Sequence, residues 1–226
     1  MQVICCKMVG MTNPNDPFPP SDFDNWAENY DNSVSTDQFP FHGYQEVLRQ
    51  IIILARPRPG LSVLDLGTGT GNLAMLFTRA KCELWCTDFS EAMLAKARQK
   101  IPAAHFVLHD LRTDLPSGFT GPFDRIVSAY VFHHFELSEK IRILKSLAAR
   151  LAPAGTIVIG DIAFPDRAAL EQIKAEAGDE WEDEFYWLAD ESLSALEGAG
   201  LQAAYQQVSS CAGVFVLSST KRNKKG

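Results

Sequence analysis

The stretch Ser62-Val63-Leu64-Asp65-Leu66-Gly67-Thr68-Gly69-Thr70-Gly71-Asn72 decides the fold. It begins as an apolar run typical of a buried strand, and a helical pattern resumes after Asn72. The glycines at alternate positions between them let the backbone adopt positive φ and come close to a bound molecule. Free N–H groups at the start of the following helix can donate to a carboxylate, hydroxyl or phosphate. The stretch therefore predicts a strand, a tight turn and a helix that together bind a nucleoside cofactor.

Asp65 is a charged residue inside the apolar run of this expected strand. A carboxylate without a partner would be costly to bury there. Its presence favours a ligand-binding turn over a glycine-rich turn that binds nothing.

After residue 61 the sequence alternates between strand and helix patterns. Strands are expected at residues 62–66, 83–88, 105–109, 123–129 and 156–161, and helices at 72–80, 90–100 and 138–151. This alternation is typical of a parallel sheet with helices on both faces, so the expected fold class is α/β. The last part of the chain differs, because helices at 167–177 and 190–198 precede two strands, 201–208 and 214–219, that can pair antiparallel.

The chain is expected to form one domain with appendages, because 226 residues of which 46% are apolar supply one sizeable core. Residues 1–20 hold a proline-rich run and are expected to be a flexible arm. A single domain then covers residues 21–220, within which 21–59 form N-terminal helices that cap the core and 165–190 form a substrate-side insert. Residues 221–226 are a basic tail, which we interpret as a solvated chain end.

Composition argues against several classes of protein. The formal net charge of -7 disfavours a large surface for nucleic acid, which would need clustered basic residues. No apolar run approaches the roughly 18 to 20 residues that span a bilayer, so no membrane segment is expected. The odd number of cysteines, 5, indicates a reducing compartment and a cytoplasmic location. Cys82 and Cys86 lack a histidine or second cysteine pair at zinc-ligand spacing, so no metal site is predicted.

The spacing of the glycines bears on the choice of cofactor. Dinucleotide enzymes carry Gly-x-Gly-x-x-Gly, whereas here the glycines fall at positions 67, 69 and 71 and residue 72 is Asn, which disfavours a dinucleotide oxidoreductase. Asp88 ends the second strand, where a carboxylate can accept two hydrogen bonds from ribose hydroxyls or can instead cap the next helix. Asp110, after the third strand, is placed either to accept from an adenine amino group or to hold a turn.

Several runs resemble successive motifs of class I S-adenosylmethionine-dependent methyltransferases. They are Val63-Leu64-Asp65-Leu66-Gly67-Thr68-Gly69-Thr70-Gly71-Asn72, Asp88, His109-Asp110-Leu111, Ile126-Val127-Ser128-Ala129-Tyr130-Val131-Phe132-His133-His134 and, with one glycine fewer than the family's usual turn, Arg150-Leu151-Ala152-Pro153-Ala154-Gly155-Thr156. Upstream, Phe23-Asp24-Asn25-Trp26-Ala27-Glu28-Asn29-Tyr30-Asp31 resembles the N-terminal helix that closes over the cofactor in small-molecule members. The resemblance covers about Phe23 to Thr220, and the pattern is most similar to uncharacterised methyltransferases of the Bacillus type.

The resemblance implies a Rossmann-like fold and S-adenosyl-L-methionine as the cofactor. The expected sheet is seven-stranded and mostly parallel, in the order 3-2-1-4-5-7-6 with strand 7 antiparallel, with helices on both faces and N-terminal cap helices. The residues at the family's cofactor positions are Tyr30, Asp65, Gly67, Thr68, Gly69, Gly71, Asp88, Phe89, Met93, Asp110, Leu111, Ala129 and Tyr130. The glycine turn would face the methionine part, Asp88 the ribose, and Phe89 and Met93 the adenine. An ordinary place in the core stays open for Phe89 and Met93.

His133 and His134 follow the fourth strand and are the candidate catalytic residues, because an imidazole there can accept a proton. We expect His133 to face the pocket and His134 to pack, with a purely structural, hydrogen-bonded role as the alternative for both. The candidate substrate-binding residues are His133, Asp161, Phe164 and Tyr186. Aromatic side chains of the insert could either roof an acceptor cavity or dock the insert on the sheet.

The leading hypothesis is an enzyme that moves a methyl group to a small-molecule acceptor by in-line displacement. A dry pocket that aligns the reacting atoms can accelerate this reaction without an obligatory acid or base. A non-catalytic S-adenosylmethionine-binding or regulatory protein is the alternative. We expect no nucleic acid and no membrane as partners, and a monomer or homodimer.

Overall fold

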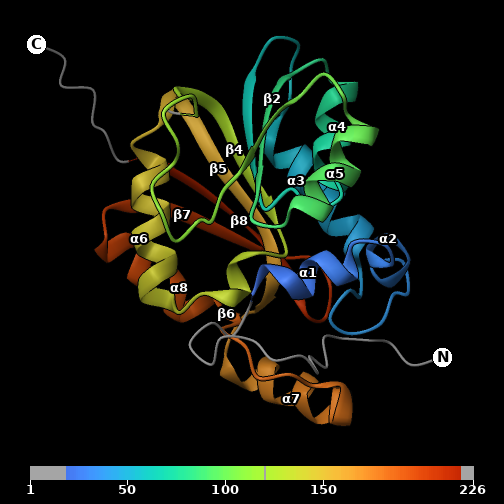
Figure 1. Ribbon diagram of the computed structural model, residues 1–226. Helices are drawn as coiled ribbons and strands as arrows, with labels where there is room; N and C mark the ends of the chain where they lie inside the picture. Colours follow the sequence, from blue (N-terminus) through green and yellow to red (C-terminus); the bar gives the residue numbers. More distant parts are fainter. Residues whose placement is uncertain (1–18, 120, 220–226) are drawn as a thin grey trace, which may run out of the picture.

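The computed structural model describes residues 19–119 and 121–219 of the chain (Figure 1). Apart from the last two residues of the expected arm, both the arm at 1–20 and the basic tail at 221–226 lie outside the described residues. The strands are β1 (Ser62–Leu66), β2 (Glu83–Asp88), β3 (His105–Leu108), β4 (Phe123–Ala129), β5 (Leu151–Phe164), β6 (Trp187–Leu188), β7 (Leu201–Gln207) and β8 (Ala212–Ser219). The α-helices are α1 (Pro20–Trp26), α2 (Tyr30–Ser33), α3 (Tyr44–Ala55), α4 (Asn72–Arg79), α5 (Glu91–Lys100), α6 (Leu137–Ala148), α7 (Arg167–Ala177) and α8 (Ala189–Gly198), and the 3-10 helices are η1 (Phe132–His134) and η2 (Gly178–Glu180).

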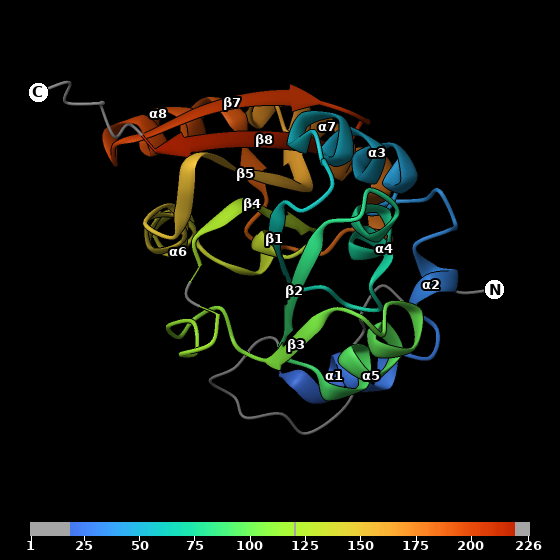
Figure 2. The same ribbon diagram turned by 90° about the horizontal axis from the view of Figure 1, so that it is seen from above.

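The strands form one sheet in the order β3-β2-β1-β4-β5-β8-β7, with β6 paired beside the end of β5 (Figure 2). Neighbouring strands are parallel except that β8 runs antiparallel to both β5 and β7. The predicted order 3-2-1-4-5-7-6 is confirmed, and the added strand β6 shifts the numbering of the last two strands. The order reverses between β1 and β4, and ligands of open α/β sheets bind where the order reverses, at the carboxyl ends of the strands.

Helices cover both faces of the sheet: α3, α4 and α5 lie on one face, and α6 and α8 on the other (Figure 2). Along β1, Val63 packs into the core on the α3 side, whereas Leu64 and Leu66 pack into the core on the α6 side. Burying each such side chain contributes roughly 1.5–3 kcal/mol. The apolar run is therefore buried on both faces, as expected of a central parallel strand. Within residues 19–119 and 121–219, none of the helices combines the length and apolar character that crossing a bilayer requires.

Helix α3 lies directly on β5 because Gly160 has no side chain. A Cβ at Gly160 would lie 2.5 Å from Val47 Cγ1 and 2.7 Å from Ile51 Cδ1. Val47 and Ile51 are completely buried in this contact. A larger residue at position 160 would push the helix away from the strand.

Two strands differ most from the prediction, whereas β3, β7 and β8 differ from it by one or two residues at one end. β5 begins at Leu151 rather than at residue 156, because its pairing with β4 includes Phe123 opposite Leu151 before a shift of register. At its other end β5 continues to Phe164, where it pairs with β6. β6 has 2 residues, too few for a hydrophobic period to reveal it in the sequence.

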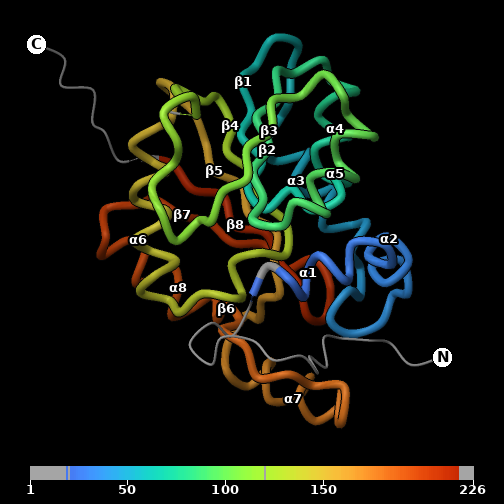
Figure 3. Tube along the Cα trace, viewed as in Figure 1, coloured from blue at the N-terminus to red at the C-terminus, as the bar shows by residue number. Residues whose placement is uncertain are grey.

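Helices α1 and α2 lie across the carboxyl edge of the parallel strands, beside α5 (Figures 1 and 3). Polar contacts hold them there, and the pairs are Asp24 with Ser90, Glu28 with Lys96, and Asp31 with both Lys100 and Thr70. Thr70 belongs to the glycine turn, whose first and second glycines lie at the same edge. The N-terminal segment therefore covers the place where a cofactor is expected.

Candidate active site

A cavity of about 540 Å³ lies at the carboxyl edge of the sheet. This volume is in the range of ligand sites, roughly 300–1,000 Å³. The expected cofactor residues that line it are Tyr30, Gly67, Gly69, Asp88, Phe89, Met93, Asp110, Leu111, Ala129 and Tyr130. The expected acceptor residues that line it are His133, His134 and Tyr186. The fold therefore brings both sets of residues to one space.

The glycine turn has a backbone conformation that side chains disfavour. Gly67, Gly69 and Gly71 have φ of 60°, 53° and 89°. A Cβ on Gly67 would lie 2.4 Å from Val131 Cγ2, whereas one on Gly69 would meet no described atom within 4 Å. Gly71 precedes α4 and packs against Ala97, so it shapes the turn but does not line the cavity. Gly69 is the glycine that leaves open space for a ligand.

Asp65 holds the shape of this turn. Its carboxylate accepts a hydrogen bond from Thr68 Oγ1 at 2.6 Å. Burial raises the pKa of Asp65 to about 7, opposed by the Thr68 hydrogen bond and reinforced by the charge of Asp88. Asp65 and Thr68 line a small hollow beside the main cavity, together with Tyr30. The buried carboxylate that the sequence singles out therefore has its partner within the turn.

Asp88 joins the end of β2 to the turn. Its Oδ2 accepts from the Gly69 N–H at 2.8 Å and its Oδ1 from the Ser90 N–H at 2.9 Å. Burial raises the pKa of Asp88 to about 6, although these hydrogen bonds favour the ionised form. Ser90, not Asp88, caps α5, because the Ser90 hydroxyl accepts from the Met93 N–H. The Phe89 N–H also bonds this carboxylate, which keeps acceptor capacity for a ribose hydroxyl.

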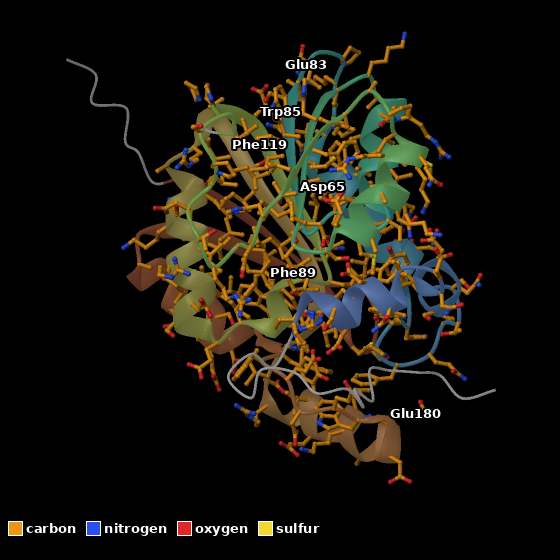
Figure 4. The ribbon with its side chains drawn as sticks, in the orientation of Figure 1. Asp65, Glu83, Trp85, Phe89, Phe119 and Glu180 are labelled. Atoms are coloured by element: carbon orange, nitrogen blue, oxygen red, sulfur yellow. The ribbon has the colours of Figure 1, made fainter. Side chains whose placement is uncertain are left out.

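Apolar side chains form the end of the cavity beside α5. Phe89 and Met93 line it, and the ring of Phe23 from α1 lies 4.8 Å from the ring of Phe89. Figure 4 shows Phe89 at the edge of the sheet next to α1, opposite the edge that carries Glu83. Met93 is also 2% exposed, so it is a core residue and a wall residue at once. This end of the cavity suits the flat adenine ring.

Asp110 lines the cavity while holding a turn. Its carboxylate oxygens lie 3.0 Å and 2.9 Å from Arg112 Nε, and Oδ1 also accepts from the Arg112 N–H at 2.9 Å. Arg112 Nη2 also pairs with Oδ2 at 2.7 Å, so Arg112 contacts both oxygens of this carboxylate. Asp110 is therefore a turn aspartate that also lines the cavity. This position is compatible with both alternatives, the turn and the contact with adenine.

His133, His134 and Glu184 face one another at the other end of the cavity. Glu184 Oε2 lies 3.4 Å from His133 Nε2 and 3.9 Å from His134 Nδ1. His133 Nδ1 lies 2.5 Å from Asp161 Oδ1, so the carboxylate assigns the proton to that nitrogen. Asp161 Oδ2 accepts from Trp187 Nε1 at 3.1 Å. His133 is therefore oriented from behind, with Nε2 toward Glu184. His134, a candidate catalytic residue that we expected to pack, also lines the cavity.

Burial and charge shift the pKa values of this cluster in different directions. Burial lowers the pKa of His133, but the carboxylates of Asp161 and Glu184 outweigh it, so the net shift is upward. At His134 burial acts with the nearby His133 and Lys140 to hold the pKa well below its usual range. Burial also raises the pKa of Glu184. These groups titrate as one coupled cluster.

Two residues expected to bind substrate lie behind the cavity wall. Asp161 and Phe164 are both completely buried, and neither lines the cavity. Asp161 supports His133, and Phe164 packs under the rings of Trp181 and Tyr186, 6.2 Å and 6.0 Å away. In this geometry both support residues that line the cavity, and their contact with substrate stays a prediction. Tyr186 does face the cavity, so the insert both docks on the sheet and roofs the site.

Lys140 and Glu184 are site residues that the sequence analysis missed. Lys140 is 1% exposed on α6, where it shares the buried face with Ile143, Leu144 and Leu147. Its Nζ donates to the Phe185 carbonyl oxygen. Lys140 lies at the helical spacing of these apolar residues, so the sequence did contain a signal that its side chain would be buried. Glu184 carried no such signal, because only the fold brings it beside the histidines.

Comparisons with known proteins agree with the fold and the site. A family model described as a methyltransferase domain matches residues 63–155. An uncharacterised methyltransferase of Geobacillus kaustophilus (strain HTA426) is 31% identical over 212 residues, which cover 88% of this chain and 95% of that protein. An uncharacterised methyltransferase of Bacillus pumilus (strain SAFR-032) is 31% identical over 214 residues, which cover 88% of this chain and 96% of that protein.

Solved structures share the fold. The DhpI-SAM-HEP complex matches with a TM-score of 0.71 at 17% identity, over 91% of this chain and 99% of that one. Magnesium protoporphyrin IX methyltransferase (ChlM) from Synechocystis PCC 6803 with bound SAH matches with a TM-score of 0.70 at 19% identity, over 89% of this chain and 98% of that one. Together the fold and the site define a class I S-adenosylmethionine-dependent methyltransferase. Within that class, the chain belongs to the family of uncharacterised Bacillus-type methyltransferases.

The residues present fit S-adenosylmethionine. Gly69 leaves open space at the turn, and Asp88 is a buried carboxylate with acceptor capacity toward the cavity. Phe89 and Phe23 supply an apolar slot for the base. The dinucleotide alternative has no comparable support, because the turn departs from the dinucleotide spacing at Asn72.

Proposed function

We propose that this enzyme methylates a small-molecule acceptor by in-line displacement. The observation that carries the proposal is a single cavity that Gly69 and Asp88 line together with His133, His134 and Glu184. The cofactor supplies a methyl group on a positively charged sulfur. An acceptor at the histidine end can approach that methyl group along the line of the breaking bond, and such alignment supplies much of the acceleration.

The residues of the chain bind the cofactor, orient the acceptor and exclude water from the cavity. Asp88 and the glycine turn hold the cofactor, while Trp26 and Phe23 of α1 cover the cavity. His133 and His134 are the proposed catalytic residues, because their rings line the end at which the acceptor would lie. Asp161 is a positioning residue that acts through His133.

The charge around the acceptor end favours a small molecule over nucleic acid. The cavity is also lined by five carboxylates outside the expected cofactor residues, Glu136, Glu139, Glu182, Asp183 and Glu184. They would repel a phosphate backbone. The cysteines that the structure describes, Cys82, Cys86 and Cys211, are free thiols, which supports a reducing cytosol as the site of action.

Two measurements test this proposal. Calorimetry with S-adenosylmethionine and S-adenosylhomocysteine should give one binding event per chain, with no matching thermal shift from NAD. A panel of thiol, amine, hydroxyl and carboxylate metabolites should then release S-adenosylhomocysteine with one chemical class. No binding at millimolar cofactor would overturn the proposal, and binding without turnover on any class would favour a non-catalytic cofactor-binding protein.

A further inference from the structure

The acceptor end of the cavity carries a cluster with metal-ligand chemistry. His133, His134 and Glu184 each present one ligand atom, and these atoms all lie within 4.8 Å of one another. All three residues line the cavity. We propose that they bind a divalent transition-metal ion, Zn²⁺ in the first instance, at the place where the acceptor is methylated.

His133 has the surroundings of a metal ligand. Histidines that bind metals almost always donate the proton of their other ring nitrogen to a carboxylate, a carbonyl or water. Here His133 Nδ1 bonds Asp161 at 2.5 Å, and Asp161 is itself held by Trp187 Nε1 at 3.1 Å and the Ile162 N–H at 2.9 Å. The lone pair of Nε2 is thereby fixed toward Glu184, 3.4 Å away. The hydrogen bonds of Asp161 therefore fix the ring of His133 from its Nδ1 side and leave Nε2 directed toward the cavity.

The charges around the cluster leave room for a cation. The buried region around the cluster holds two carboxylates, those of Asp161 and Glu184. The ammonium group near them is that of Lys140. Lys140 donates to the Phe185 carbonyl oxygen and lies 4.3 Å from the ring centroid of Trp187. Metal ligation requires both imidazoles to be neutral, and one ammonium would then face two carboxylates, an unbalanced buried charge that is costly. A divalent ion bound by neutral imidazoles and a carboxylate supplies the missing positive charge.

The donor set indicates the kind of ion. Two imidazole nitrogens and one carboxylate oxygen are the ligands of catalytic zinc sites, which keep a fourth position open. Bonds of about 2.0–2.2 Å would draw the three ligand atoms closer together. The open position would face the cavity, since all three ligands line it. The absence of a metal site in the sequence-based prediction rested on cysteine spacing, whereas this cluster is assembled by the fold from residues 133, 134 and 184.

The ion would also select the acceptor, an inference that rests on the proposed function. A bound ion lowers the pKa of a coordinated S–H or O–H group, so a thiol or hydroxyl acceptor would lose its proton to water on binding. A lone pair of the resulting sulfur or oxygen anion forms the bond to the methyl carbon, while the old carbon–sulfur bond breaks and leaves its electron pair on the cofactor's sulfur. The products are the methylated acceptor, S-adenosylhomocysteine and the released proton. An amine acceptor would have no need of the ion.

Titration with Co²⁺, a coloured substitute for Zn²⁺, tests the site directly. Tag-free protein is stripped with a chelator and titrated while visible absorption is recorded, and Zn²⁺ is then added as competitor. We expect one Co²⁺ per chain with the spectrum of a low-coordinate site, displaced by Zn²⁺. Glu184→Gln and His134→Gln should each lower the affinity at least tenfold, by analogy with the roughly 10- to 100-fold losses caused by outer-shell changes.

Glu182→Gln is the matched control, because Glu182 lines the same cavity outside the cluster and this variant should keep the Co²⁺ affinity. S-adenosylhomocysteine binding is measured on every variant, so a folding defect is recognised as a loss of both ligands. A wild type that binds Co²⁺ no more tightly than Glu184→Gln would overturn the inference and leave His133 as an imidazolium paired with the two carboxylates. The spectrum needs no acceptor and no turnover, so its failure is distinct from failure of the proposed function.

Discussion

The backbone N–H of Gly69 donates to Oδ2 of Asp88 at 2.8 Å, which ties the turn after β1 to the end of β2. The open backbone expected to face the methionine part of the cofactor and the carboxylate expected to accept the ribose are therefore joined by one hydrogen bond. A change at either residue is expected to disturb both parts of the cofactor site. Four predictions follow from this hydrogen bond and from its surroundings.

Cofactor affinity should fall in mild acid. The proposed ribose contact needs the ionised form of Asp88, and burial raises the pKa of this carboxyl to about 6. Affinity should therefore be full above about pH 6 and fall by up to about tenfold per pH unit below it. Calorimetry with S-adenosylhomocysteine across this range measures the effect.

Asp88→Asn should bind S-adenosylhomocysteine more weakly, by about 10- to 100-fold, since hydrogen bonds to charged groups are worth about 1.5–3 kcal/mol. A wild type with flat affinity, or Asp88→Asn with the same pH dependence, would contradict the assignment.

The same raised pKa has the opposite effect on the ligand-free protein. Between the ordinary carboxyl pKa of 3.8 and about 6, folded Asp88 holds a proton that the unfolded chain releases. Its contribution to the free energy of unfolding is therefore present below the lower value and lost as the pH rises through the upper one. The control for the affinity measurement is accordingly thermal unfolding without cofactor at each pH.

Two glycine variants should differ in stability for a single reason. Gly67→Ala and Gly69→Ala both place a side chain at positive φ, which costs about 1–2 kcal/mol. Only the first also drives a Cβ to 2.4 Å from Val131 Cγ2. Gly67→Ala should therefore lower the free energy of unfolding by at least about 1 kcal/mol more than Gly69→Ala, by analogy with overpacked cores. Urea titrations of both variants give the difference, and equal values would mean that Val131 can move aside.

Loosening α2 should speed release of the cofactor. Asp31 bonds Lys100 and Thr70 at 2.6 Å and Asn72 at 3.0 Å, so Asp31→Ala removes several ties between α2 and the glycine turn. We expect a loss of about 1 kcal/mol, or about fivefold in the dissociation rate, because partly exposed pairs contribute about 0.2–1 kcal/mol each.

Stopped-flow release of S-adenosylhomocysteine measures that rate. Glu28→Gln is the control, since it breaks a pair with Lys96 in which the Glu28 side chain is 76% exposed, and it should change the rate little. A release rate that is the same in Asp31→Ala and in the wild type would show that α2 does not limit departure of the cofactor.

Removing the donor to Asp161 should destabilise the protein. Trp187→Phe keeps an aromatic ring in the core but deletes the Nε1 hydrogen bond to the completely buried Asp161. A buried acceptor deprived of a partner costs about 1–3 kcal/mol. Trp181→Phe is the matched change, because its Nε1 bonds the exposed Asp183 and water can replace that bond. Chemical denaturation of the two variants should separate them by about 1 kcal/mol or more, and a similar loss in both would contradict the role of Asp161.

The sheet could be predicted from the sequence because its signals are local. The run from Val63 to Leu66 is buried on both faces, and the turn after it uses positive φ at each of its glycines. β6 could not be predicted, since Trp187 and Leu188 form a strand only where the end of β5 offers an open edge. The start of β5 at Leu151 likewise depends on its partner in β4 rather than on its own pattern.

The cofactor end of the site was more predictable than the acceptor end for a related reason. Asp88 and Gly69 stand at strand ends, and a parallel sheet brings strand ends together whatever the sequence between them. Glu184 reaches His133 through the irregular segment before β6, whose path no period encodes. Asp161 was expected to bind substrate as the last residue of the predicted strand 156–161, but β5 continues to Phe164 and the Asp161 side chain contacts Trp187 and His133.

The close packing of α3 against Gly160 affects when the domain can fold during synthesis of the chain. α3 leaves the ribosome before every strand of the sheet, yet Val47 and Ile51 are buried against β5, near the end of the chain, and α3 also contacts β8. The helix cannot complete the burial of its apolar face until those strands have been synthesised. We therefore expect the domain to complete its folding late, in one step in which its first long helix packs against its last strands. A chain that ends before β8 would leave the apolar face of α3 exposed to chaperones and proteases.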